Sequence, residues 1–276
     1  MNPSVRKVIV PAAGFGTRSL PASKAIPKEM MTLVDRPLIQ WAVEEAVASG
    51  LTRVGIITAA WKTAIERHFG RSPELEAFLE NKGKAVELEE VRRIARLADF
   101  SFIVQDEPRG LGHAVLMGEA FAAGEPVAVM NPDTLYDAAV PCLKQLKDVF
   151  EARGASTIVL GPIDEEGTRR YGVARVEKVA DRVFRVLDIV EKPGPEKAPS
   201  GLGVFGRYVF TPAIFVALRE TLPGYGGEVQ LTDAIRILIK REPVFGVAFE
   251  GRRFDAGGRE GFIEATLALA SKGISR

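Results

Sequence analysis

The chain has 276 residues, of which 46% are hydrophobic and 26% are charged, and this composition predicts one globular unit with a sizeable core. Its 37 Lys and Arg residues nearly balance 36 Asp and Glu residues, so the formal net charge of +1 argues against a broad electrostatic surface for nucleic acid or anionic membranes. Any anion that the protein binds must therefore be met by local charges.

Cys142 is the only cysteine, which excludes an intrachain disulfide and a thiolate metal cluster. We expect it to be a small core residue in an amphipathic helix rather than a catalytic thiol. The opening segment MNPSVRK lacks the apolar stretch of a signal peptide, and no run approaches the ~20 apolar residues that span a bilayer. These features predict a cytoplasmic protein with no membrane or nucleic-acid partner.

Strand-like apolar runs alternate with helical patterns over the first part of the chain. The expected strands cover residues 7–12, 54–59, 102–105, 127–131 and 157–161. Helical spacing of apolar residues is clearest over residues 37–50 and in the segment after Gly83. This alternation predicts an α/β fold: a mostly parallel (mixed) central sheet with helices on both faces, in a Rossmann-like three-layer α/β/α arrangement.

The pattern changes after about residue 165. Shorter alternating runs, separated by turn residues, predict antiparallel strands in a smaller β-rich lobe; these runs cover residues 172–178, 182–192 and 203–210. Residues 193–201 are rich in proline and glycine, and we expect them to form a lid or hairpin loop. The remaining patterns predict helices over 211–221 and 231–242, a strand over 243–249 and a last helix over 259–273.

The first strand runs into a glycine-rich turn that carries positive charge. In Val8–Met30, VIVPAAGFGTRSLPASKAIPKEM, Gly14 and Gly16 precede Arg18 and two lysines. Glycines permit close backbone approach, and consecutive free N–H groups form an anion-binding concavity. The dinucleotide fingerprint would need a third glycine at Ser19, and the Gly-Lys-Ser/Thr of the phosphate loop is absent. The turn therefore predicts a polyphosphate site of another kind, unless it is only a tight turn with solvated cations.

Two segments of this stretch, AAGFGTR and PKEM, resemble the signature of the sugar-1-phosphate nucleotidyltransferases. The likeness continues in matching order through VDRPLIQW, GLGHAVL, DRVFRVLDIVEKP, GRYVF and GGEVQLTDAI, and it is closest to bacterial members that transfer uridylyl groups. Between His68 and Phe100 the chain also resembles an insertion that these members carry and their thymidylyl-transferring relatives lack. The resemblance implies one domain over residues 1–276, with a nucleotide-binding part over about 1–160 and a sugar-binding and C-terminal helical part over about 161–276.

The resemblance also implies roles for individual residues. Those assigned to the nucleotide are Ala13, Gly14, Gly16, Thr17, Gln105 and Gly110. Those assigned to the sugar are Gly172, Glu191 and Glu228. The catalytic cations are Arg18, Lys28 and Lys192, and Asp133 and Asp255 would hold Mg²⁺.

Chemistry supports several of these roles. Asp133 follows the apolar strand VAVM, at the strand end where ligands bind in open α/β sheets, and a carboxylate there can hold Mg²⁺ together with substrate phosphates. The preceding Asn131-Pro132 departs from the relatives' pattern, which leaves the details of metal coordination open. Gln105 offers the donor and acceptor that the imide edge of uracil requires. We expect His113 to be a packing residue rather than a catalytic base, because an anionic nucleophile needs none.

Plain structural readings stay open for the same residues. The two aspartates could be turn formers, Gln105 a polar residue at a strand exit, and Glu191-Lys192 a surface pair. Residues near Glu228, Thr232 and Asp233, could merely cap the next helix.

The implied reaction is Mg²⁺-dependent in-line transfer of a uridylyl group from UTP to glucose 1-phosphate, giving UDP-glucose and pyrophosphate. Two alternatives remain: thymidylyl transfer on the same scaffold, and a non-catalytic regulator that binds nucleotide sugars. A nicotinamide enzyme is disfavoured by the missing third glycine. Apolar residues of the late helices, such as Ile235 and Leu238, could be core or interface, and the family suggests a homodimer or homotetramer.

Overall fold

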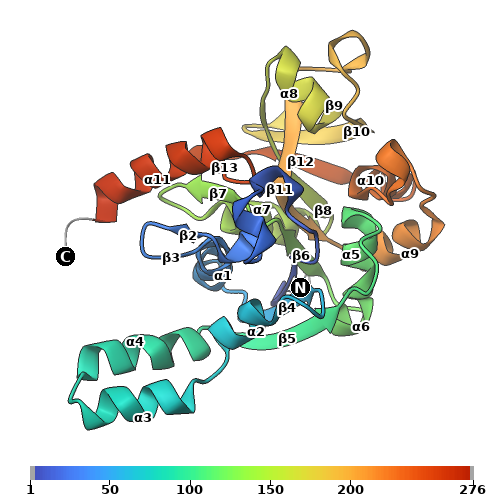
Figure 1. Ribbon diagram of the computed structural model, residues 1–276. Coiled ribbons are helices and arrows are strands. Elements are labelled where there is room, and N and C mark those ends of the chain that lie inside the picture. Colours follow the sequence, from blue (N-terminus) through green and yellow to red (C-terminus); the bar gives the residue numbers. More distant parts are fainter. Residues whose placement is uncertain (1–3, 274–276) are drawn as a thin grey trace.

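A nine-stranded mixed sheet runs through the centre of the molecule (Figure 1), in a computed structural model that describes residues 4–273. The strand order is β5-β4-β1-β6-β11-β8-β12-β10-β9. The bounds are β1 Lys7–Pro11, β4 Arg53–Thr58, β5 Asp99–Val104, β6 Val127–Met130, β8 Ser156–Pro162, β9 Gly172–Ala180, β10 Val183–Glu191, β11 Leu202–Phe210 and β12 Val244–Ala248. Residues 1–3, part of the opening segment in which we expected no signal peptide, lie outside the described residues.

One half of the sheet is parallel, as the alternation predicts. Strands β5, β4, β1 and β6 pair in parallel, and β8 pairs in parallel with β12. Strands β1 and β6 are buried on both faces, which explains why their sequences are continuous apolar runs. The five predicted strands are confirmed, with β5 beginning three residues earlier than expected, at Asp99.

The other half corrects the predicted topology. The sheet is not mostly parallel, because β11 lies antiparallel between β6 and β8, and β10 lies antiparallel between β12 and β9. The antiparallel pairing of β9 with β10 is confirmed, but these strands extend the central sheet instead of forming a sheet of their own. Alternation within a strand reveals which faces are buried and not which strand will be its neighbour, so the central place of β11 was not visible in the sequence.

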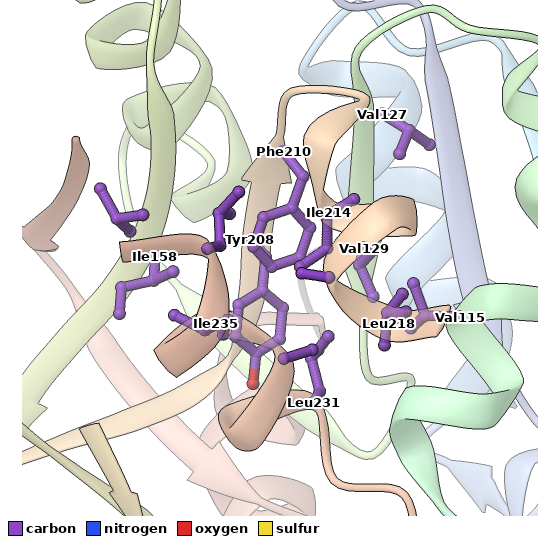
Figure 2. Close-up of a cluster of buried hydrophobic side chains, with 14 of the residues drawn as sticks. Val115, Val127, Val129, Ile158, Tyr208, Phe210, Ile214, Leu218, Leu231 and Ile235 are labelled. Atoms are coloured by element: carbon purple, nitrogen blue, oxygen red, sulfur yellow. The ribbon is translucent and has the colours of Figure 1, made fainter. Parts of the chain in front are cut away.

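Side chains along the strands point alternately to the two faces of the sheet, and each face carries one hydrophobic cluster. The first contains Val129 and Tyr208 and packs against helices α5 Leu111–Met117, α9 Ala213–Glu220 and α10 Leu231–Ile239. Figure 2 shows Tyr208 and Phe210 of β11 among side chains of α9 and α10. The second contains Ala128 and Met130 and packs against α1 Leu38–Ala48 and α7 Cys142–Arg153. This division follows from the alternation of side chains along a strand.

The structure shows whether Cys142 and two apolar residues of the late helices are buried. Cys142 is fully buried at the start of α7, which confirms a core role. Ile235 and Leu238 of α10 are also fully buried, so they belong to the core and not to an interface.

The region that resembles a family insertion forms a helical hairpin. Its helices are α3 Pro73–Asn81 and α4 Ala85–Ala95, preceded by α2 Thr63–Phe69. The hairpin projects from the body in Figure 1, and Ile94 and Leu97 pack its base against the second cluster.

The remaining elements are short or peripheral. The further helices are α6 Glu119–Ala122, α8 Glu165–Arg170 and α11 Arg259–Gly273. Two small sheets pair β2 Thr32–Leu33 with β3 Arg36–Pro37, and β7 Thr134–Asp137 with β13 Arg252–Asp255. The loop expected over 193–201 contains a single 3₁₀ turn, Pro195–Lys197. Within residues 4–273 no helix has both the length and the apolar character required to cross a membrane.

Candidate active site

A cavity of about 910 Å³ lies beyond the ends of β1 and β6. Every residue that the family resemblance assigns to a role lines it: Ala13, Gly14, Gly16, Thr17, Arg18, Lys28, Gln105, Gly110, Asp133, Gly172, Glu191, Lys192, Glu228 and Asp255. These residues are separated by up to 242 positions in the chain, from Ala13 to Asp255, yet the fold brings them together. The cavity is the site that we call the central cavity below.

The glycine-rich turn forms one wall of the central cavity. Gly16 has φ of 67°, a left-handed conformation that favours glycine, and the Ser23 hydroxyl donates to its carbonyl oxygen at 2.8 Å. A Cβ on Gly16 would lie 3.0 Å from the Lys28 side chain, whereas a Cβ on Gly14 would meet nothing within 4 Å. Gly16 is thus required by the turn itself, and Gly14 leaves open space on the cavity side.

A charged cluster stands beside this turn. The Lys28 Nζ donates to Asp133 Oδ2 at 2.7 Å, and the exposed Arg18 guanidinium lies 3.6 Å from the same oxygen. Burial acts to raise the pKa of Asp133, but Lys28 and Arg18 outweigh burial and the pKa is lowered. Burial acts to lower the pKa of Lys28, but Asp133 and Glu29 outweigh it and the pKa is raised. Both groups are therefore charged at neutral pH.

A buried arginine holds the turn that carries Asp133. Arg207 of β11 is fully buried and donates to the carbonyl oxygens of Asn131, at 2.8 Å, and Thr134, at 2.7 Å. These two carbonyls flank Asp133 in the chain. The guanidinium also forms an ion pair with Glu45 of α1 at 2.7 Å. We did not predict this function for Arg207, although an arginine inside the apolar run GVFGRYVF was a visible signal of it.

A buried lysine ties the glycine-rich turn to the segment that carries Lys28. The Lys62 Nζ donates to the carbonyl oxygen of Ala12 at 2.6 Å and to Glu29 Oε2 at 2.8 Å, and its side chain is fully buried. Ala12 precedes the turn, and Glu29 follows Lys28 in a 3₁₀ helix, Lys28–Met30. The sequence around Lys62 gave no sign of this role, because it is an isolated lysine next to a tryptophan.

Asp255 lies close to Asp133 because of the β7–β13 pairing. In that ladder Thr134, the residue after Asp133, stands opposite Asp255. Asp255 accepts hydrogen bonds from the Tyr171 hydroxyl and from Arg170, whose NH2 is 3.0 Å away. The described residues hold no group of three or more His, Cys, Asp or Glu side chains that could bind a metal without other ligands. Two carboxylates that line the same cavity still fit a divalent cation that shares its coordination with substrate phosphates.

Glu191 and Lys192 lie in another wall of the central cavity. Lys192 has φ of 44°, and a left-handed conformation is rare for a residue with a side chain. Its backbone N–H donates to the Tyr171 carbonyl at 3.2 Å, and its Nζ lies 4.9 Å from the centre of the Tyr225 ring. Glu191 accepts from the Thr232 hydroxyl at 2.7 Å. The pair is therefore fixed by the fold and is not a free surface pair.

Gly172 and Glu228 complete this wall. A Cβ on Gly172 would lie 2.5 Å from Thr232 Cγ2, so close packing requires a glycine there. Glu228 lies next to Gly110, where a Cβ would come within 2.7 Å of the Glu228 Cβ. Gly110 also has φ of 103°, so any side chain at this position would be strained.

Gln105 lies at the end of β5 and is only 4% exposed. Its backbone N–H donates to the Thr58 carbonyl at 2.8 Å, and its side-chain Nε2 lies 2.6 Å from His113 Nδ1 on α5. His113 does not line the central cavity; it stands behind Gln105.

Known proteins resemble this chain over nearly its whole length. A family model described as "Nucleotidyl transferase" matches residues 7–272. The chain is 49% identical over 266 residues to a UTP–glucose-1-phosphate uridylyltransferase of Bacillus subtilis (strain 168), which covers 96% of this chain and 91% of that relative. A solved structure of UDP-glucose pyrophosphorylase complexed with UDP-glucose matches with a TM-score of 0.89 and 41% identity, over 97% of this chain and 99% of that one. A UTP-bound UGPase from Acinetobacter baumannii matches with a TM-score of 0.90 and 35% identity, over 98% and 95% of the two chains.

Proposed function

We propose that this chain, which belongs to the nucleotidyl transferase family, transfers the uridylyl group of UTP to glucose 1-phosphate and releases pyrophosphate and UDP-glucose. The observation that carries the proposal is the content of the central cavity. Its lining combines the glycine-rich turn with Arg18 and Lys28, the Glu191-Lys192 pair and the Gln105 side chain. A single cavity that holds three cations and an amide among its lining residues suits two phosphorylated substrates.

The charges of the two substrates and of the cavity define the proposed reaction. A phosphate oxygen of glucose 1-phosphate attacks the α-phosphorus of UTP in line, and the bond from that phosphorus to the pyrophosphate oxygen breaks. Because the nucleophile is already an anion, no general base is required, and catalysis rests on positioning and charge neutralisation. Arg18 and Lys28 neutralise the departing pyrophosphate. Lys192 orients the attacking phosphate.

The neutral groups of the cavity position the rest of the two substrates. The N–H groups of the turn at Ala13, Gly14, Gly16 and Thr17 bind the phosphates of UTP. Gln105 and Gly110 contact the uracil base. Glu191, Glu228 and the backbone of Gly172 contact the glucose hydroxyls.

Asp133 and Asp255 would hold the divalent cation, which we propose to be Mg²⁺. When bound, the cation adds positive charge between the carboxylates and the substrate phosphates, which lowers the cost of bringing two anions together. The lowered pKa of Asp133 supports this role, because an ionised carboxylate is the form that binds a cation.

Initial rates of pyrophosphate release over a grid of nucleotides and sugars test the proposal. UTP and dTTP are each combined with glucose 1-phosphate, galactose 1-phosphate and no sugar. We expect the highest kcat/KM for UTP with glucose 1-phosphate and no release without a sugar phosphate. A preference for dTTP would assign the chain to thymidylyl transfer. Binding of UDP-glucose without any pyrophosphate release would make it a regulator and refute the proposal.

The proposal extends to the architecture, the division of the chain, its location and its assembly. The two hydrophobic clusters on opposite faces of the sheet support a Rossmann-like three-layer arrangement. The gathering of the glycine-rich turn from the first part of the chain and Glu191 from the second supports a division near residue 160 into nucleotide-binding and sugar-binding parts. Cytoplasmic location and a homodimer or homotetramer are proposed from the family resemblance and from the single buried cysteine.

A further inference from the structure

The contact between Gln105 and His113 is a short hydrogen bond behind the base-binding corner of the central cavity. Gln105 Nε2 lies 2.6 Å from His113 Nδ1. With the amide in this orientation its nitrogen donates, so Nδ1 accepts and the ring proton is on Nε2, whereas an amide turned by 180° would pair with the other tautomer. Burial lowers the pKa of His113, Arg109 lowers it further, and Glu107 acts weakly in the opposite direction. The ring is therefore uncharged at neutral pH and can accept this bond.

This bond determines which atoms Gln105 presents to a ligand. With one N–H directed to His113, the amide keeps its carbonyl oxygen and one N–H for the central cavity, which Gln105 lines. Across the described chain, no protein group donates to that carbonyl oxygen, and it is not among the buried polar atoms without a partner. It is thus open to a donor from a bound molecule.

The orientation has a consequence for base recognition. Uracil carries a donor at N3 between two acceptors, so a carbonyl oxygen facing N3–H is favourable. Cytosine carries an acceptor at N3, which would face the same carbonyl oxygen. If the amide turned by 180°, it would present N–H to N3 and would suit cytosine instead. Without a partner behind it, the amide can adopt either orientation, as the two differ little in shape.

We propose that His113 is a positioning residue that locks the Gln105 amide in the orientation that accepts uracil and rejects cytosine. The inference rests on the proposed function, because it concerns how that reaction selects its nucleotide. His113 acts through Gln105 and not on the substrate. Thymine has the same hydrogen-bonding edge as uracil, so His113 selects against cytosine and leaves the choice between UTP and dTTP unchanged.

Three variants test this selection. His113→Leu removes the acceptor, His113→Asn places an amide oxygen near the position of Nδ1, and His68→Asn changes the other histidine, which contacts Gln40 far from the cavity wall. For each, kcat/KM is measured with UTP, dTTP and CTP. For His113→Leu we expect the preference for UTP over CTP to fall about tenfold or more, mainly through KM for the nucleotide, with KM for glucose 1-phosphate unchanged. His113→Asn should recover most of the preference, and His68→Asn should keep all of it.

A measurement on the unmodified protein covers the case in which His113→Leu does not fold. The chain has two histidines, so ¹⁵N NMR of the imidazoles resolves the tautomer of each. With bound UMP, His113 should be protonated on Nε2 only.

The inference and the proposed function fail in different ways. A wild-type protein that releases no pyrophosphate from UTP would refute the proposed function. An active wild type with an unchanged UTP-to-CTP preference in folded His113→Leu, or with a proton on His113 Nδ1, would overturn only the role of His113.

Discussion

Asp133 is the carboxylate on which the charges of the central cavity depend. It lies 2.7 Å from the Lys28 Nζ and 3.6 Å from the Arg18 guanidinium, and the two cations together keep it ionised. Loss of the Asp133 charge would remove a carboxylate that we propose as a ligand of the divalent cation. It would also break the ion pair that fixes the Lys28 side chain. In the proposed reaction Asp133 would therefore act both on the bound cation and on Lys28.

We predict that Asp133→Asn lowers kcat by ~100-fold or more while the protein still folds, on the scale of other changes to transition-state electrostatics. Pyrophosphate release and a circular dichroism melt measure the two effects. The matched control is Asp181→Asn, because the Asp181 side chain is 91% exposed in the turn between β9 and β10. Near wild-type turnover in Asp133→Asn would refute its role.

The sequence predicted some residues of the candidate site and missed others. The proposed site residues, from the glycine-rich turn to Glu191, could be named because they stand in short motifs that resemble those of a known family. The partners of Arg207 and Lys62 could not be named, since they include carbonyl groups that are 50 or more positions away, such as that of Ala12 for Lys62. The position of Arg207 inside an apolar run showed only that its side chain needs buried partners. Long-range hydrogen bonds from side chain to backbone leave no periodic trace in a sequence.

At the scale of elements, Arg207 joins three parts of the fold. It lies on β11, binds the turn between β6 and β7, and pairs with Glu45 of α1, whose carboxylate also accepts from the N–H of Leu143 at the start of α7. The fully buried Arg207 guanidinium is tolerated because its N–H donors have acceptors.

Arg207→Met should therefore destabilise the protein by about 3–5 kcal/mol, because it leaves the Glu45 charge and two carbonyl oxygens without their partner. Urea unfolding followed by fluorescence measures this change. Arg96→Met removes an ion pair to Glu89 of similar length, but both side chains are more than 60% exposed, and we expect less than about 1 kcal/mol. Equal effects of the two changes would contradict the account of Arg207.

The helical hairpin α3–α4 shows the limit of an argument from resemblance. Its presence favoured uridine, yet no residue from Pro73 to Ala95 lines the central cavity. The hairpin is therefore not part of the candidate site. In the proposed function, selection of the base would therefore fall to Gln105 and the residues that hold it.

The fold as a whole was predictable in part. Apolar runs and helical spacing indicated the α/β class and the parallel strands, since each follows from local burial. The antiparallel insertion of β11 and the extension of the sheet by β9 and β10 were not predictable, because strand order depends on contacts between distant segments.

Removal of divalent cations tests the molecule as a whole. Because the described residues hold no metal cluster of their own, a chelator should abolish pyrophosphate release and leave the melting temperature of the free protein unchanged. Addition of Mg²⁺ in excess should restore the rate. Full activity in the presence of EDTA would contradict the proposed role of Asp133 and Asp255.

The central claim is that both substrates meet in one cavity, between the glycine-rich turn and Lys192. A crystal structure with UDP-glucose and Mg²⁺ tests it most directly. We predict uracil at Gln105 and Gly110, the diphosphate between the turn and Lys192, and glucose beside Glu191. A nucleotide sugar bound elsewhere, with the turn empty and Arg18 and Lys28 directed to solvent, would contradict the account.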